Sequence, residues 1–184
     1  MSVKQRLAAV GLSASLILAG GTLVAPWEGK ENKAYKDVVG VWTQCYGNTN
    51  NVDRTKPKTD DQCTDELAKE LINYNAKMKK YVKVEMTIGQ EAAFTSLVYN
   101  VGEGNWKSST ALKLLNKGEY EKACQQLLRW NKAGGKEYRG LTNRRKAELE
   151  VCLGNNKQAI EEAERIFKLY KESELLDVLD KEGM

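Results

Sequence analysis

The sequence has no histidine among its 184 residues. This absence excludes imidazole acid–base catalysis, Ser-His and Cys-His nucleophile pairs, and metal sites built on imidazole ligands. Any catalysis must therefore use carboxylates, hydroxyls, lysine or cysteine. The chain also has no C-x-x-C pair and no internal repeat.

The composition is that of one folded domain. Of the residues, 41% are hydrophobic and 29% are charged, which is too apolar for a disordered chain. The formal net charge is +4, but residues 157–184 carry five Lys/Arg and eight Asp/Glu, so the preceding 156 residues carry +7. Such a surface suits an anionic polymer, either nucleic acid or an acidic cell-wall glycan, and charge alone does not decide between them.

An uncharged stretch of 19 residues runs from Leu7 to Ala25, after Lys4 and Arg6. As a helix it would be about 28 Å long, close to the thickness of the hydrocarbon core of a bilayer. The cations before it and Glu28 after it predict insertion with the N-terminus inside. Only eight of the 19 residues are Leu, Ile or Val. They supply about −2 to −5 kcal/mol of insertion free energy, so the predicted span is marginal.

Four interpretations of this stretch remain open on these grounds. It can be a signal peptide cleaved after Leu23-Val24-Ala25, a permanent anchor, a buried helix of a soluble domain, or a weak span that later leaves the membrane intact. A permanent anchor is normally more hydrophobic, and a buried helix normally carries polar residues on one face. The fourth interpretation requires the Ala- and Gly-rich composition that is present.

The four cysteines, Cys45, Cys63, Cys124 and Cys152, fit an exported, oxidising destination. Their spacings of 18, 61 and 28 residues lack the close pairs of structural zinc sites. Two disulfides are expected instead, and four cysteines allow three pairings. We favour Cys45–Cys63 with Cys124–Cys152, because each bond then closes a loop within one half of the chain.

Beyond Gly47 the sequence predicts helices. Two capping boxes, TDDQ at 59–62 and TIGQ at 87–90, each precede apolar side chains at helical spacing. Later helices are delimited by Ser or Thr caps and by glycines. The expected helices are a long one after Thr59, a largely apolar central one after Thr87, and others at Ser109–Gly118, Tyr120–Trp130, Thr142–Gly154 and Gln158–Leu179.

Residues 28–50 are rich in Tyr, Val and Trp, which favour strands, and Gly40 supplies a turn. We therefore predict a small antiparallel hairpin beside the helical body, with a cleft between them. Asp37 and Thr43 lie three residues on either side of Gly40, so a turn there would place them side by side. Glu28 would approach from the end of the first helix.

These three side chains match the needs of inverting glycoside hydrolysis. One carboxyl protonates the leaving oxygen, and a second carboxylate with a hydroxyl holds and activates water on the opposite face of the sugar. Taken alone, Glu28 would be a surface charge, Asp37 a turn residue and Thr43 a strand residue. Only their combination points to a catalytic site.

The spacing Glu28, eight residues, Asp37, five residues, Thr43 resembles the E-x8-D-x5-T triad of phage-type lysozymes, glycoside hydrolase family 24. The weak N-terminal span is similar to that of the signal-anchor-release endolysins of this type. The resemblance covers residues 1 to about 156, and residues 157–184 have no counterpart in it. Further stretches similar to motifs of the family are YKDVVGVWT at 35–43, YNVGEGN at 99–105, AGGK at 133–136 and GLTNRR at 140–145.

The resemblance implies an α+β, mostly helical, lysozyme-like fold with a small antiparallel β-hairpin lobe, a larger helical lobe and a cleft between them. Three segments are expected. They are a weakly hydrophobic signal-anchor-release segment at 1–26, a catalytic domain at 27–156, and a charged amphipathic helical tail of unknown role at 157–184.

The resemblance also implies that Glu28 is the general acid and that Asp37 with Thr43 positions the attacking water. The implied substrate is the β-1,4 bond between N-acetylmuramic acid and N-acetylglucosamine in peptidoglycan. No cofactor and no metal are implied. The motif residues Asn100 and Arg144-Arg145 are interpreted as structural.

The implied localisation is the host inner membrane, with the N-terminus inside and the body in the periplasm, and then the soluble periplasm after release. The implied partners are peptidoglycan and, through residues 7–25, the inner membrane before release; we expect a monomer that binds no nucleic acid. Glu28 lies three residues beyond Ala25, which is about 10 Å of extended chain. An inserted span therefore holds the acid away from the cleft, and collapse of the membrane potential is the trigger of release that the family implies.

Two alternative functions share these features. A membrane-tethered protein could bind wall glycan through its basic face without cutting it. A lytic transglycosylase would cleave the same bond without water, and the Asp37/Thr43 pair argues against that reaction. A nucleic-acid binder lacks any basic-aromatic motif here and would lie on the wrong side of the membrane.

Overall fold

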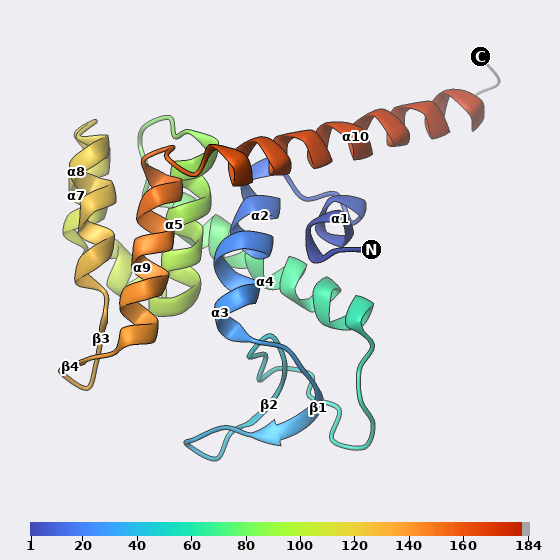
Figure 1. The fold of residues 1–184 in the computed structure, drawn as a ribbon, viewed down its shortest axis with the longest axis horizontal. Coiled ribbons are helices and arrows are strands. Elements are labelled where there is room, and N and C mark those ends of the chain that lie inside the picture. Colours follow the sequence, from blue (N-terminus) through green and yellow to red (C-terminus); the bar gives the residue numbers. More distant parts are fainter. Residues whose placement is uncertain (182–184) are drawn as a thin grey trace.

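The structure is a computed structural model and describes residues 1–181. A helical lobe makes up most of the molecule, and a small β-hairpin lobe projects from one end of it (Figure 1). This is the α+β, mostly helical arrangement that the resemblance implies, with the small hairpin beside the helical body that residues 28–50 predict. Residues 182–184 of the predicted tail lie outside the described residues.

The N-terminal segment is folded into the helical lobe as one short helix and, after a break at residues 10–13, three helical pieces that follow one another directly. Ser2 and Ser13 cap the first two pieces, and Gly11, with a φ of +88°, turns the chain between them. Residues 7–25 therefore do not form one uninterrupted helix in this structure, and no described helix is long and apolar enough to cross a membrane. The pieces are α1 (Val3–Ala9), α2 (Ala14–Leu18), the π-helical η1 (Ala19–Val24) and α3 (Ala25–Glu28).

The hairpin consists of β1 (Glu31–Lys36) and β2 (Trp42–Cys45), paired antiparallel. The register pairs Tyr35 with Thr43, so the expectation that Asp37 lies beside Thr43 is wrong. The Asp37 carboxylate accepts hydrogen bonds from the backbone N–H groups of Val39 and Val41. The middle of the turn therefore lies one residue before Gly40. Asp37 is therefore diagonal to Thr43 across the hairpin.

The remaining helices form the body of the large lobe. Both predicted capping boxes are present, at Thr59 and Thr87, and Ser109 caps its helix as expected. The helix expected to open at Thr142 begins at Arg139 instead. The elements are α4 (Asp60–Lys79), α5 (Ile88–Val101), α6 (Glu103–Lys107), α7 (Thr110–Asn116), α8 (Tyr120–Gln125), the 3-10 helix η2 (Gln126–Arg129), α9 (Arg139–Cys152) and α10 (Lys157–Lys181), with a short strand pair β3 (Lys132–Ala133) and β4 (Lys136–Glu137) before α9.

Helix α5 is the centre of the core, and α2, η1, α4 and α9 all pack against it. Helix α9 approaches so closely that a Cβ on Gly89 would lie 2.3 Å from the carbonyl oxygen of Val151. The fully buried side chains of the N-terminal segment contribute directly to this core. They are Leu7, Ile17, Leu18, Ala19, Leu23 and Val24.

Both favoured disulfides are confirmed. Cys45–Cys63 joins the end of β2 to α4, and Cys124–Cys152 joins α8 to α9. The first bond therefore fixes the hairpin lobe to the helical lobe at the base of the hairpin.

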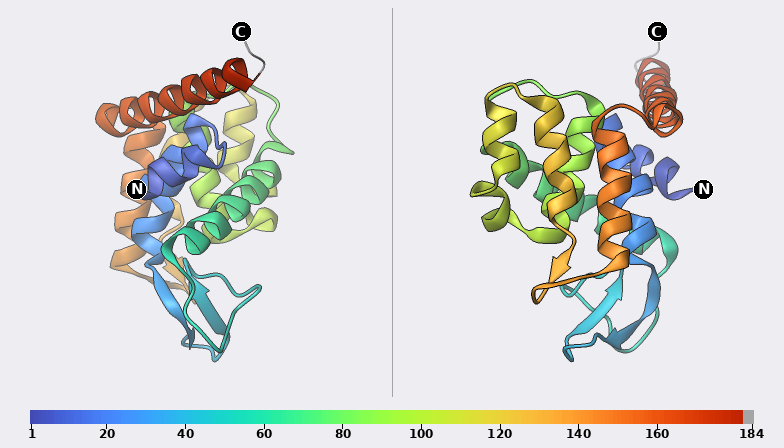
Figure 2. Two further views of the ribbon diagram at one scale, coloured as in Figure 1. Left: turned by 90° about the vertical axis from the view of Figure 1, so that its right-hand side faces the viewer. Right: turned by 60° about the vertical axis from the view of Figure 1, so that its left-hand side comes forward.

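Helix α10 lies across α1 and α2 with its first half and extends beyond the body with its second half (Figures 1 and 2). Ala159 and Ala163 are buried in this contact. Lys4 Nζ also lies 2.6 Å from Glu162 Oε2. The tail thus packs on the body through one apolar side of α10, and much of the surface that it covers belongs to the N-terminal segment.

Candidate active site

Glu28 is the last residue of α3, and its side chain is 23% exposed. Arg144 Nη1, on α9, donates to Glu28 Oε1 at 2.8 Å. The other carboxylate oxygen, Oε2, accepts no hydrogen bond from any described residue. It lies beside Gly47, where an added Cβ would come within 3.3 Å of it. A glycine suits position 47 for two reasons. Its φ of +78° is a conformation that other residues rarely adopt, and a side chain there would crowd this oxygen.

A buried charged network lies next to Arg144. Glu148 Oε1 accepts hydrogen bonds from Arg145 Nη2 and from Ser96 Oγ, each at 2.7 Å, and lies 3.5 Å from Arg144 Nε. Arg145 Nη1 donates to Asn100 Oδ1 at 2.9 Å. Burial raises the pKa of Glu148, whereas the two arginines and Ser96 favour its charged form. These contacts connect α5 to α9 beneath Glu28.

Asp37 and Thr43 are held by one residue of the hairpin, Val41. Asp37 Oδ1 accepts the Val41 N–H at 2.8 Å, and Thr43 Oγ1 donates to the Val41 carbonyl at 3.1 Å. The second oxygen of Asp37 accepts no hydrogen bond among the described residues, and the Thr43 oxygen keeps its lone pairs. Both groups can therefore accept hydrogen bonds from a water molecule.

A pocket opens beside Glu28, between the hairpin lobe and the helical lobe. The structure brings Glu28 into this pocket but leaves Asp37 and Thr43 outside its lining. The loop after β2 forms one wall, and side chains of α4 and α5 form the other. The lining residues are Glu28, Tyr46, Gly47, Asn48, Thr49, Asn50, Glu70, Tyr74, Tyr99 and Asn100.

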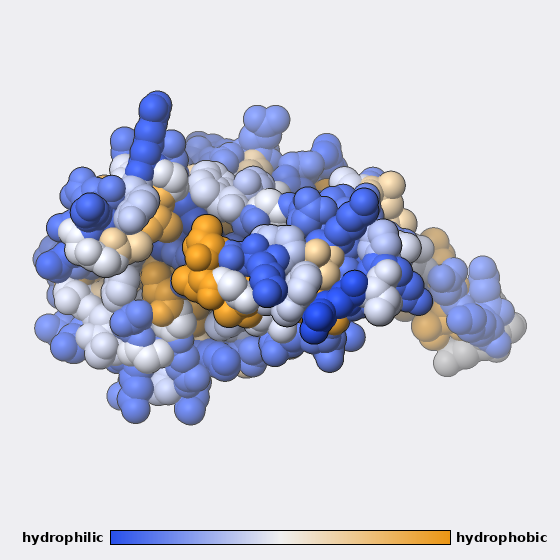
Figure 3. All heavy atoms as spheres, turned by 90° about the horizontal axis from the view of Figure 1, so that it is seen from below, coloured by the Kyte–Doolittle hydropathy of each residue, from blue (hydrophilic) through white to orange (hydrophobic). Residues whose placement is uncertain are grey.

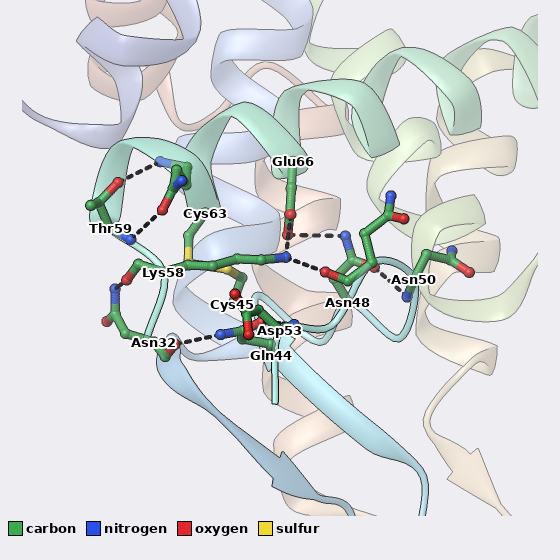
Figure 4. Close-up of polar contacts among 12 residues, drawn as sticks. Asn32, Gln44, Cys45, Asn48, Asn50, Asp53, Lys58, Thr59, Cys63 and Glu66 are labelled. Carbon is green, nitrogen blue, oxygen red and sulfur yellow. Dashed lines mark hydrogen bonds and ion pairs between the residues drawn. A yellow bond between two sulfur atoms is a disulfide. The ribbon is translucent and has the colours of Figure 1, made fainter. Parts of the chain in front are cut away.

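Polar contacts shape the loop that forms the first wall (Figure 4). Lys58 Nζ pairs with Glu66 of α4 and donates to the Asn51 carbonyl at 2.6 Å. Glu66 also accepts from Asn48 Nδ2 at 3.3 Å, and the buried Gln44 side chain bridges Asn32 and Asp53. The loop is thereby fixed to α4 next to the Cys45–Cys63 bond.

Two tyrosines lie in the pocket, with the ring centroids of Tyr74 and Tyr99 5.0 Å apart. Burial, together with the negative charges of Glu28 and Glu70, raises the pKa of Tyr99 well above its usual value. Burial and the same two carboxylates raise the pKa of Tyr74. Both phenols therefore stay protonated at neutral pH and can donate hydrogen bonds.

The sequence interpretation of Arg144 as structural is incomplete, because this side chain binds the candidate acid directly. The interpretation of Arg145 and Asn100 is nearer to the structure, since they bind each other. The sequence does not single out Glu70 or Tyr74 as a site residue. Their spacing of four residues on one helix face is the only sequence signal that they carry.

The surface seen from the hairpin side is largely hydrophilic, and hydrophobic surface gathers in a small patch (Figure 3). Exposed apolar side chains at the hairpin turn are Val38, Val39 and Val41.

A profile of the Phage lysozyme family matches residues 25–148. The chain belongs to the phage lysozyme family. It is accordingly a glycoside hydrolase of the lysozyme type that cleaves peptidoglycan. The matched range contains Glu28, the hairpin, the pocket lining and the Arg144–Glu148 network, whereas residues 1–24 and α10 lie outside it.

Individual relatives support the same family. A SAR-endolysin of Bacteriophage PS119 is 43% identical over 141 residues, which are 76% of this chain and 84% of that protein. A SAR-endolysin of Enterobacteria phage P21 is 40% identical over 76% of this chain and 86% of that protein.

Solved structures of the P1 phage endolysin Lyz are also similar to this lysozyme. The active form has a TM-score of 0.69 at 27% identity and covers 74% of this chain and 84% of that one. The secreted inactive form has a TM-score of 0.50 at 23% identity, over 78% of this chain and 96% of that one.

The buried network predicts a large effect of Glu148→Gln. This change leaves Arg144 and Arg145 without their shared counter-charge, so we expect a loss of about 3 kcal/mol or more in unfolding free energy. Urea denaturation followed by circular dichroism measures it. Glu150→Gln, an exposed change on the same helix, is the control and should stay within about 0.5 kcal/mol of the parent. Equal stabilities of the two variants would contradict this role of Glu148.

Proposed function

We propose that this lysozyme hydrolyses the β-1,4 bond between N-acetylmuramic acid and N-acetylglucosamine with inversion, using Glu28, Asp37 and Thr43. The observation that carries the assignment is the geometry of Glu28. Arg144 engages Oε1, so Oε2 is the oxygen that can hold a proton toward the pocket. Transfer of that proton to the glycosidic oxygen breaks the bond to the leaving sugar.

Asp37 and Thr43 supply the second half of the proposed reaction. A water molecule that donates to the unengaged Asp37 oxygen and is oriented by Thr43 attacks the anomeric carbon, and Asp37 takes up its proton. Because neither residue lines the pocket around Glu28, the substrate must extend from that pocket toward the hairpin. A lytic transglycosylase would need no such water-binding pair and is not favoured.

Glu28→Gln tests the catalytic assignment. The amide keeps the shape and loses the transferable proton, so we expect the rate of peptidoglycan digestion to fall at least about 100-fold. Mass spectrometry of the parent's products should show reducing-end muramic acid, whereas anhydro-muramic acid would support a transglycosylase. Glu31→Gln, an exposed change three residues later, is the control. Digestion by Glu28→Gln at the rate of this control would disprove the role of Glu28.

We also propose that residues 7–25 first cross the host inner membrane with the N-terminus inside, and that activity follows when they leave it. In that inserted state Lys4 and Arg6 lie on the cytoplasmic side, and α4 and α10 lie in the periplasm. In the structure Lys4 pairs with Glu162 at 2.6 Å, and Arg6 binds both carboxylate oxygens of Asp65 at 3.0 Å. These pairs require both ends of the segment on one side, so they favour the released state.

The contacts of α10 with the N-terminal segment suggest a role for this helix. Its first half covers α1 and α2, with Ala159 and Ala163 buried, and it lies outside the matched family range. We propose that α10 stabilises the released segment and takes no part in bond cleavage. The similarity to the active form of the P1 endolysin, larger than to its secreted inactive form, supports the view that this fold is the released, active one.

Substitutions that test release must make insertion of the segment into the bilayer more favourable and must not introduce clashes in the released structure. Leucine at Gly20 or Gly21 fails this requirement, because an added Cβ would lie 2.6 Å from Leu7 or 2.3 Å from Lys4. Ala9 is exposed, and Thr22 Oγ1 is buried without a hydrogen-bond partner among the described residues. Ala9→Leu with Thr22→Val meets the requirement.

For this double variant we expect a three- to eightfold higher ratio of membrane-bound to soluble protein and later lysis. Each added apolar side chain favours insertion by about 0.3 to 0.6 kcal/mol. Fractionation of expressing cells measures the ratio. Ala9→Gln, at the same exposed site, is the control and should lower it. An unchanged ratio, or a soluble species that lacks about 25 N-terminal residues as after signal cleavage, would refute intact release.

A further inference from the structure

Glu70 is a second carboxylate of the pocket, and no step of the proposed reaction uses it. It lines the same pocket as Glu28 but comes from α4, on the wall opposite the loop. Its side chain is half-buried.

Glu70 differs from the neighbouring glutamate on the same face of α4 in having no partner among the described residues. Glu66, one turn earlier, is paired with Lys58 and accepts a hydrogen bond from Asn48. Glu70 forms no ion pair and no hydrogen bond with any residue between 1 and 181. Glu66 therefore holds the loop, whereas the carboxylate of Glu70, which lines the pocket, keeps its capacity to accept hydrogen bonds.

The surroundings of Glu70 suit a sugar. Tyr74 follows one turn later on α4, and Tyr99 lies against it with the ring centroids 5.0 Å apart. Aromatic rings offer an apolar surface to the faces of sugar rings. The Tyr99 hydroxyl donates to the Tyr46 carbonyl at 3.4 Å, whereas the Tyr74 hydroxyl donates to no described residue and can donate to a ligand. The pocket therefore combines a carboxylate acceptor with an aromatic wall, at a distance in sequence from the catalytic residues.

A ligand that covers a half-buried carboxylate must replace the hydrogen bonds that water gave it, because an unsatisfied charge is costly to bury. The glycan of peptidoglycan carries suitable donors in its hydroxyl and acetamido N–H groups. We propose that Glu70 binds the glycan by accepting hydrogen bonds from these groups, and that it sets the affinity for the substrate rather than the rate of bond cleavage. This rests on the pocket around Glu28 being the glycan-binding cleft.

Two substitutions of Glu70 distinguish the effect of its charge on KM from the effect of its acceptor oxygens. Glu70→Gln keeps an acceptor oxygen and should raise KM about three- to tenfold, whereas Glu70→Ala should raise it about ten- to hundredfold, because hydrogen bonds to a charged acceptor are the stronger ones. The change in kcat should stay within about threefold for both. Glu85→Gln removes an exposed carboxylate that lines no described pocket and serves as the charge-matched control.

A direct binding measurement makes the test independent of turnover. In the Glu28→Gln background, calorimetry with a peptidoglycan tetrasaccharide of alternating N-acetylglucosamine and N-acetylmuramic acid should show the same loss of affinity when Glu70→Ala is added. Circular dichroism and the unfolding midpoint verify that each variant is folded.

Unchanged affinity and KM, or a loss confined to kcat, would overturn the proposal for Glu70. If Glu28→Gln alone also digests peptidoglycan at the parental rate, the assignment of the pocket itself has failed. If Glu28→Gln is inactive while Glu70→Ala behaves like Glu85→Gln, only the assignment of Glu70 has failed.

Discussion

The apolar side chains of residues 7–25 must be buried, and the catalytic acid that we propose follows them after only two further residues. In this structure most of them are buried in the core of the helical lobe, and Leu7, Ile17 and Leu23 are fully buried. Ser96 Oγ lies 3.3 Å from the carbonyl oxygen of Leu23 and donates to Glu148, so the end of the segment and the charged network share one contact. Where the segment is buried therefore decides where the acid can lie.

The charged network beneath Glu28 links this packing to the orientation of the Glu28 side chain, because Arg144 binds Glu28. Burying Arg144, Arg145 and Glu148 costs desolvation free energy that only well-formed partners can offset. Ser96 and Asn100 of α5 bind Glu148 and Arg145 of α9, and Glu28 of α3 binds Arg144. The close approach of α5 and α9 depends on the missing side chain of Gly89. A displaced α9 would thus weaken the core and turn Arg144 away from Glu28.

Much of this fold is local in origin and could be predicted from the sequence. The capping boxes at Thr59 and Thr87 define helix starts through side chains three residues apart, and the disulfides follow from loop proximity. The hairpin register could not be predicted, because it depends on which backbone N–H groups donate hydrogen bonds to the Asp37 carboxylate. The broken N-terminal helix depends on packing against α5 and α10, and Glu70 is marked only by the absence of the partners that Glu66 has.

Hydrogen exchange on the soluble, active, full-length protein tests the central claim most directly, namely that the N-terminal segment is part of the core when Glu28 is in the pocket. The account predicts that the backbone amides of residues 16–24 are present and are protected about as strongly as those of α5, because they open only with the core. Amides that exchange within seconds, or active protein from which these residues are missing, would contradict it.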